Sequence, residues 1–227
     1  MGGATDFIAP LVTIAVSIAL GPEIAALAAD AATESAYLQR FHHHPSYSRE
    51  RIFRAHLAWG RRHQQAALPR AMLVRGPANR RPLVVAYLSA DLRRHPVGVL
   101  LSAAIKHHDR SSMRVVIGDT GTVTFDDTTA ALRGVADRWL DLRGLSDDQV
   151  FSVLREEAID ICVDLSGHTP GNRLPVLARR VAPVQATWLG YWNTTGMTEI
   201  DFFLTSGEEV PSDRQRFFSE RVVRSEE

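Results

Sequence analysis

Two glycine-rich corners lie close together in the chain, and each directly follows an apolar run. "SGHTPGN" covers residues 166–172 and "GYWNTTG" covers residues 190–196. Glycine lets the backbone approach a ligand closely, and the N–H groups exposed at the start of a helix bind anions. Turn glycines are common, so the same corners also fit tight turns that bind nothing. Both interpretations stay open on the corners alone.

The usual nucleotide and metal motifs are missing from the sequence. Neither corner is G-x-G-x-x-G, and no G-x-x-x-x-G-K-[ST] occurs, so the common dinucleotide and P-loop enzymes lose support. The triple histidine at 42–44 could hold a metal, but its setting favours an exposed loop, and we expect no metal site. Cys162 lies inside the apolar run "IDICVDL", which favours a small buried hydrophobe over a nucleophile.

Composition limits the classes of protein and partner. The 227 residues are 45% apolar and 23% charged, enough for one sizeable core or for one domain plus an extension. The formal net charge of zero gives no broad basic field for nucleic acid. The uncharged segment 7–20 is shorter than the about 20 residues of a membrane span, and no basic segment precedes it as in a secretory signal. We expect a cytoplasmic protein without nucleic-acid or membrane partners.

The first third of the chain has helical patterns. They cover residues 23–41 and 49–68, with Ser48 as a candidate N-cap of the second helix. The stretch 69–82 mixes proline, glycine and arginine without a period, as a linker does. We therefore assign residues 1–80 to a helical extension and linker and residues 81–227 to one further unit.

From residue 83 onward short apolar runs alternate with helical patterns, which predicts an α/β fold with a parallel sheet. The expected strands are 83–89, 113–120, 138–142, 159–166, 184–190 and 201–206, the last completing the series, and the expected helices are 97–108, 126–136, 146–158 and 172–181. Such sheets bind ligands at the carboxyl ends of their strands. The corner "SADLRRHP" at 89–96 and the two glycine corners should therefore share one rim.

Three segments, in this order, resemble the protein O-GlcNAc transferase and SPINDLY-like family. They are "RPLVVAYLSADLRRHPVG" from residue 81, "VDLSGHTPGNRLPVLARRVAPVQATWLGYWNTTGM" from residue 163, and "DFFLTS" from residue 201. The resemblance runs from about Ser48 to the carboxyl end and is most specific across 160–196. It implies a GT-B glycosyltransferase of two facing Rossmann-like halves, which moves N-acetylglucosamine from a UDP-sugar to serine or threonine hydroxyls of a protein or peptide. No cofactor is implied beyond the donor substrate UDP-N-acetylglucosamine.

The resemblance also implies site residues. His95, in the His-Pro corner, would lie beside the acceptor and handle a proton, a role suited to a side chain that titrates near neutral pH, although a helix-capping or loop histidine remains the alternative. The "WLGY" corner would face the sugar donor, and the neighbouring rim would line the same site. The implied substrate-binding residues are His168, Asn172, Leu189, Gly190, Tyr191, Thr194, Thr195 and Gly196.

Three departures from the family pattern qualify this expectation. Trp192 stands where proline is more usual, and Val99 stands where many members have a second histidine. The second Rossmann-like half, which holds most nucleotide contacts in the family, is missing. We therefore expect a truncated or half catalytic domain that is inactive alone and has the missing half as a possible partner. The alternative is a non-catalytic remnant or protein-interaction module that retains the fold.

Overall fold

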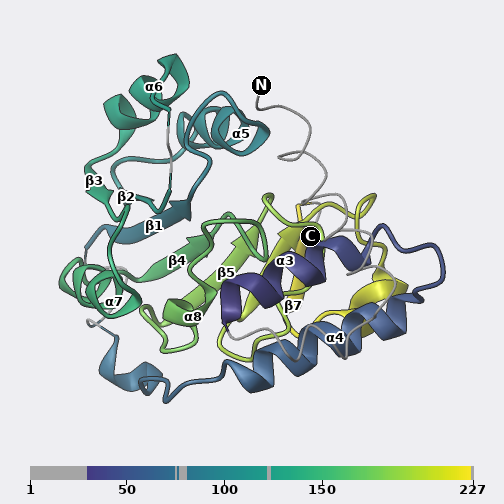
Figure 1. Cartoon of the computed structure of the whole chain (residues 1–227). Helices are drawn as coiled ribbons and strands as arrows, with labels where there is room; N and C mark the ends of the chain where they lie inside the picture. The colour runs from purple at the N-terminus through teal and green to yellow at the C-terminus, as the bar shows by residue number, and fades with distance from the viewer. Residues whose placement is uncertain (1–29, 75, 77–80, 122–123, 226–227) are drawn as a thin grey trace, which may run out of the picture.

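The computed structural model describes residues 30–74, 76, 81–121 and 124–225. The apolar segment 7–20 and the first residues of the helix expected over 23–41 lie outside them. Within the described residues, seven parallel strands form one sheet in the order β3-β2-β1-β4-β5-β6-β7 (Figure 1). The strands are β1 Leu83–Ser89, β2 Met113–Asp119, β3 Arg138–Asp141, β4 Ile161–Asp164, β5 Val184–Trp188, β6 Phe202–Thr205 and β7 Arg221–Arg224.

The six expected strands are confirmed, but the prediction that 201–206 completes the series is wrong. Strand β7 adds an edge beyond β6, with Val222 paired to Phe203. Its sequence is only four residues long and both ends are arginine, so it lacks an apolar run. Only Val222 within it is buried, because an edge strand pairs along one side.

Helices alternate with the strands as expected. They are α5 Pro96–Ile105, α6 Asp127–Val135, α7 Asp147–Glu156 and the short α8 Leu174–Leu177, with 3-10 turns η1 Arg70–Met72 and η3 Ser212–Phe217. The helix expected over 172–181 ends early, because the Gln185 side chain donates to the Leu177 carbonyl and accepts from the Val181 N–H. Pro175 lies in the first turn of α8, where proline is tolerated.

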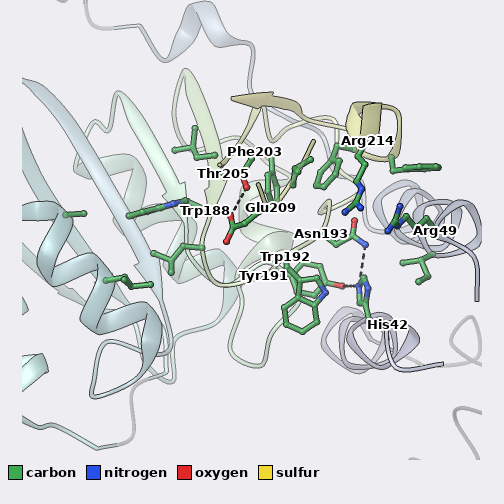
Figure 2. A pocket seen from close by; sticks show the side chains of 18 residues that line it. His42, Arg49, Trp188, Tyr191, Trp192, Asn193, Phe203, Thr205, Glu209 and Arg214 are labelled. Atoms are coloured by element: carbon green, nitrogen blue, oxygen red, sulfur yellow. Dashed lines mark hydrogen bonds between the residues drawn. The ribbon is translucent and has the colours of Figure 1, made fainter. Parts of the chain in front are cut away.

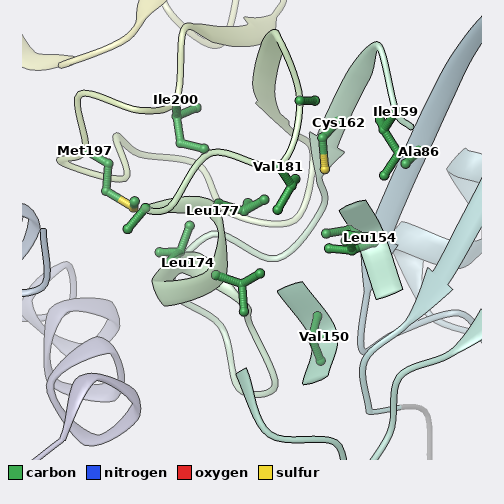
Figure 3. Close-up of a cluster of buried hydrophobic side chains, with 14 of the residues drawn as sticks. Ala86, Val150, Leu154, Ile159, Cys162, Leu174, Leu177, Val181, Met197 and Ile200 are labelled. Atoms are coloured by element: carbon green, nitrogen blue, oxygen red, sulfur yellow. The ribbon is translucent and has the colours of Figure 1, made fainter. Parts of the chain in front are cut away.

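Helices cover both faces of the sheet. α5 and α6 pack on one face against Val85, Tyr87 and Ile117. α7 and α8 pack on the other face, together with two helices from the first part of the chain, α3 Ala31–Phe41 and α4 Arg49–Arg62 (Figure 1). Cys162 lies in this second cluster (Figure 3), fully buried, and burial raises the pKa of its thiol. The prediction of a buried hydrophobe at Cys162 is confirmed.

Helix α4 touches the sheet unit through backbone as well as side chains. Ser48 caps it by accepting from the Arg51 N–H at 3.2 Å, as the sequence predicts. A Cβ added at Gly60 would lie 2.0 Å from the Gly196 carbonyl oxygen, so no side chain fits between the helix and this loop. Trp59 is buried in the same cluster as the sheet. The helical part therefore packs as one body with the sheet, while the boundary near residue 80 stays a prediction. None of the described helices is long and apolar enough to span a membrane.

Candidate functional site

The loops that follow β1, β2 and β4 meet at the carboxyl edge of the sheet. The Thr120 hydroxyl donates to the Gly171 carbonyl at 2.9 Å. A Cβ on Gly171 would lie 2.6 Å from the Cβ of Ala90, in the loop after β1. Gly171 also has a φ of +79°, which favours glycine. The close approach of these loops brings the "SADLRRHP" and "SGHTPGN" corners together.

The two glycine corners pack directly on each other. A Cβ on Gly167 would lie 2.4 Å from the Cβ of Tyr191, and a Cβ on Gly190 would lie 1.7 Å from the Leu165 carbonyl oxygen. The Asp164 carboxylate accepts from the Gly167 N–H at 2.7 Å, and burial raises the pKa of this carboxyl. The chain's own packing thus accounts for these glycines, and the Gly167 N–H already has the Asp164 carboxyl group as its partner.

His168 lies buried between the sheet and helix α3. Its Nε2–H donates to the Thr195 carbonyl at 2.9 Å, which leaves Nδ1 to accept from the Ser35 hydroxyl at 2.9 Å. Burial lowers the pKa of His168 to about 4, so the ring is neutral at pH 7. Both of its nitrogens are used to join two loops and a helix.

The Tyr191 hydroxyl is held by two histidines from the helical part. His56 donates from Nδ1 to the Ile52 carbonyl at 2.7 Å, so its Nε2 accepts from the Tyr191 hydroxyl at 2.7 Å. The Tyr191 oxygen then accepts from His42 Nε2 at 3.0 Å. Burial lowers the pKa of His42 to about 4 and that of His56 well below its usual value. The expected exposed loop at 42–44 is therefore wrong for His42, because this ring turns inward to Tyr191 (Figure 2).

The 194–196 loop is fixed by a buried carboxylate that precedes β7. Glu220 accepts from the Thr194 hydroxyl at 2.7 Å and from the Thr195 N–H at 2.7 Å, and also from the Thr195 hydroxyl. Burial raises the pKa of Glu220, while these hydrogen bonds oppose the rise. Gly196 has a φ of +77°, and a Cβ there would lie 2.1 Å from the His56 carbonyl oxygen. Thr194, Thr195 and Gly196 are all buried.

His95 is the N-cap of α5, as in the alternative prediction of a helix-capping histidine. Its Nδ1 accepts from the Val97 N–H at 3.3 Å, and Asp91 Oδ2 lies 4.0 Å from the same nitrogen. Nδ1 as an acceptor puts the proton of the neutral ring on Nε2. The side chain is 36% exposed, which leaves it accessible on the rim.

A cavity of about 650 Å³ opens beside the loop after β5 (Figure 2). Leu189, which has a φ of +62°, lines it together with Tyr191 and Trp192. Asn172 lies outside its lining: its amide donates to the Thr169 carbonyl, and its oxygen accepts from the Leu174 N–H at the start of α8. Within the described part of the chain, no group of three or more histidine, cysteine or carboxylate side chains could hold a metal ion.

Sequence reasoning missed the residues that hold this rim from a distance. Ser35, His42, His56 and Glu220 all contact predicted site residues. His42 belongs to the triple histidine at 42–44, and His56 lies in the helix expected over 49–68, but neither pattern indicates a contact with Tyr191. Glu220 directly precedes "RVV", a segment too short and too polar at its ends to predict a strand, so the sequence does not indicate its position beside the 194–196 loop.

Comparisons with known proteins agree with this architecture. Residues 63–225 match the family described as Glycosyl transferase family 41. The SPINDLY proteins of Oryza sativa subsp. japonica and Arabidopsis thaliana, each named a probable UDP-N-acetylglucosamine–peptide N-acetylglucosaminyltransferase, are 35% and 34% identical over 181 residues. The matches cover 77% of this chain and 19% and 20% of those proteins, so the chain spans about a fifth of the length of these curated relatives.

A solved structure shows the same fold. A mutant of the Thermobaculum terrenum O-GlcNAc transferase superposes with a TM-score of 0.77 at 32% identity, over 86% of this chain and 38% of that chain. The Rossmann-like parallel sheet predicted from the sequence is confirmed, and so is the family resemblance. Because the family match covers most of its length, the chain belongs to glycosyltransferase family 41.

Proposed function

We propose that this chain is the acceptor-side half of the catalytic region of a UDP-N-acetylglucosamine-dependent protein O-GlcNAc transferase. The observation that carries the proposal is the rim itself: in a family 41 chain, the His95 corner and both glycine corners follow parallel strands at one edge of one sheet. The relatives' names supply the donor and the peptide acceptor. The cytoplasmic location expected from the sequence stays a prediction.

His95 is the residue proposed to handle the acceptor proton. In the transfer, the acceptor oxygen bonds to the sugar carbon that the diphosphate leaves, and the acceptor proton must go elsewhere. With Nδ1 accepting from Val97, the neutral ring offers an Nε2–H donor. To act as a base through Nε2, the ring must carry its proton on Nδ1 instead, and Asp91 at 4.0 Å is the group that would stabilise that form.

The other proposed site residues divide into two roles. Leu189 and Gly190 lie on one partly exposed turn directly after β5, at the carboxyl edge of the sheet, so both are proposed to face the donor. His168, Tyr191, Thr194 and Thr195 are buried and already hydrogen bonded, so they are proposed to hold the donor-side loop in place. Asn172 fixes the start of α8 in the same manner.

A second half is proposed to complete the site. A diphosphate leaving group needs positioned donors or cations, which the family resemblance assigns mainly to the other Rossmann-like half. We expect the 227 residues alone to bind UDP-N-acetylglucosamine no tighter than about millimolar and to transfer no sugar. The competing function is a non-catalytic interaction module. The burial of His168 and Tyr191 is the observation behind it, because a protein that has lost turnover would keep these side chains for the stability of the fold.

A chimera tests the proposal. Residues 1–225 are joined to the second half of the Thermobaculum terrenum transferase, and transfer of radiolabelled N-acetylglucosamine to a serine peptide is measured. The chimera should turn over, and His95→Ala should lower its turnover by about 10² to 10⁴. His107→Ala, which removes an exposed histidine just beyond the same helix, is the matched control and should have no effect. A folded chimera that binds donor but shows no transfer, or an unchanged His95→Ala rate, would contradict the proposed roles.

A further inference from the structure

The cavity beside the loop after β5 has two arginines at one end. Arg49, the first residue of α4, and Arg214, in η3, both line it. Figure 2 shows their side chains directed toward each other and toward Asn193. Among the residues described by the structure, neither guanidinium forms an ion pair with a carboxylate. Two like charges that converge without a counter-charge form a site for an anionic group.

Most of the remaining cavity wall is apolar. Its walls come from α5, from the ends of β5 and β6 and from η3, and include Leu100, Ala104, Trp188, Val210, Phe217 and Phe218. Leu100 and Trp192 are 52% and 57% exposed, which is high for side chains of this size. Glu209 also lines the cavity, but it accepts from the Thr205 hydroxyl at 2.8 Å, away from the arginines (Figure 2).

We propose that this cavity binds a segment of the acceptor protein in which an acidic side chain is flanked by large apolar side chains. The carboxylate would pair with Arg49 and Arg214, and the apolar side chains would cover Leu100 and Trp192. A volume of about 650 Å³ accommodates a few side chains rather than a folded domain.

The position of the cavity relative to His95 supports this assignment, which rests on the proposed function. His95 caps α5, and Leu100 lies five residues further along the same helix, or about 7.5 Å along its axis. An acceptor chain rises about 3.3 Å per residue when extended. A segment bound in the cavity therefore places a serine or threonine two or three residues away beside His95.

Peptide binding tests the inference without any sugar donor. The probes are acetyl-Ser-Gly-Phe-Glu-Leu-Phe-amide and the same peptide with glutamine in place of glutamate, each titrated into the 227-residue chain by calorimetry. The glutamate peptide should bind about tenfold tighter than the glutamine peptide. Arg49→Gln and Arg214→Gln should each remove most of this preference, whereas Arg61→Gln, at an exposed arginine of α4 outside the cavity, should leave it unchanged.

A second variant tests the apolar wall. Leu100→Asp replaces an exposed residue, so the fold should persist, and it should weaken both peptides. Equal binding of the two peptides, or equal effects of Arg61→Gln and Arg49→Gln, would overturn the inference. So would dimers in sedimentation that no peptide dissociates, because a second copy would then occupy the cavity. Peptide binding by a chain whose chimera has no transferase activity would reject the proposed function and leave the cavity assignment standing.

Discussion

The buried His168 predicts a specific loss of stability in acid. Its ordinary pKa of 6.5 is lowered to about 4 in the folded protein, because the ring is fully buried between Ser35 and Thr195. Between these two values the unfolded chain binds a proton that the folded chain does not. The contribution of His168 to the free energy of unfolding therefore falls as the pH drops from about 7 to about 4 and levels off below that.

The size of the loss follows from the two pKa values. At about 1.4 kcal/mol for each tenfold difference in proton affinity, His168 alone accounts for a loss on the order of 3 kcal/mol. That is a large part of the stability of an ordinary domain. His56, whose ring centre lies 5.1 Å away, and His42 shift in the same direction. The three histidines together should therefore lose more stability than His168 alone.

The assay is urea unfolding followed by circular dichroism at pH 7, 6, 5 and 4. His168→Gln keeps a donor for Thr195 and an acceptor for Ser35 but does not titrate. Its stability should fall by roughly 3 kcal/mol less than that of the wild type between pH 7 and pH 4. The matched control is His107→Gln, at an exposed position. If His168→Gln and the wild type lose stability in parallel, the burial argument for His168 is refuted.

Three further predictions concern the contacts that hold the rim. Tyr191→Phe leaves the buried His56 Nε2 without its donor, so thermal unfolding should show a loss of about 1–3 kcal/mol. Gly196→Ala places a Cβ against the His56 carbonyl at a positive φ, so α4 should detach and limited proteolysis should cut within 49–62. Gly134→Ala, at a position with open space around it, is the control and should not be cut there. Glu220→Gln keeps the shape but replaces one acceptor oxygen with a donor, so amide exchange should speed up at Thr195, and an unchanged rate would show that the carboxylate does not fix this loop.

Sequence patterns predicted the sheet well because each central strand carries its own signal. Val84 to Leu88 and Val115 to Ile117 are apolar runs bounded by polar turns, and burial on both faces requires such runs. Strand β7 carried no such signal, because an edge strand buries one residue and keeps arginines at its ends.

The site was predicted only as far as local sequence reaches. The corners follow strands, so their common rim could be inferred. The contacts of His42 and His56 with Tyr191 could not, because the partners lie 149 and 135 residues apart and no local pattern links them. The burial of His168 could not be predicted either, because the local sequence of a histidine after a glycine corner does not depend on whether a helix covers it.

The contact between Gly60 and Gly196 sets an order of events during synthesis. Helix α4 leaves the ribosome first, but the 190–196 loop that covers it is synthesised more than a hundred residues later. At about 5–20 residues per second, the nascent helix waits on the order of ten seconds with its apolar face uncovered. A polypeptide released before residue 196 keeps that face exposed, which is the surface that chaperones and proteases recognise.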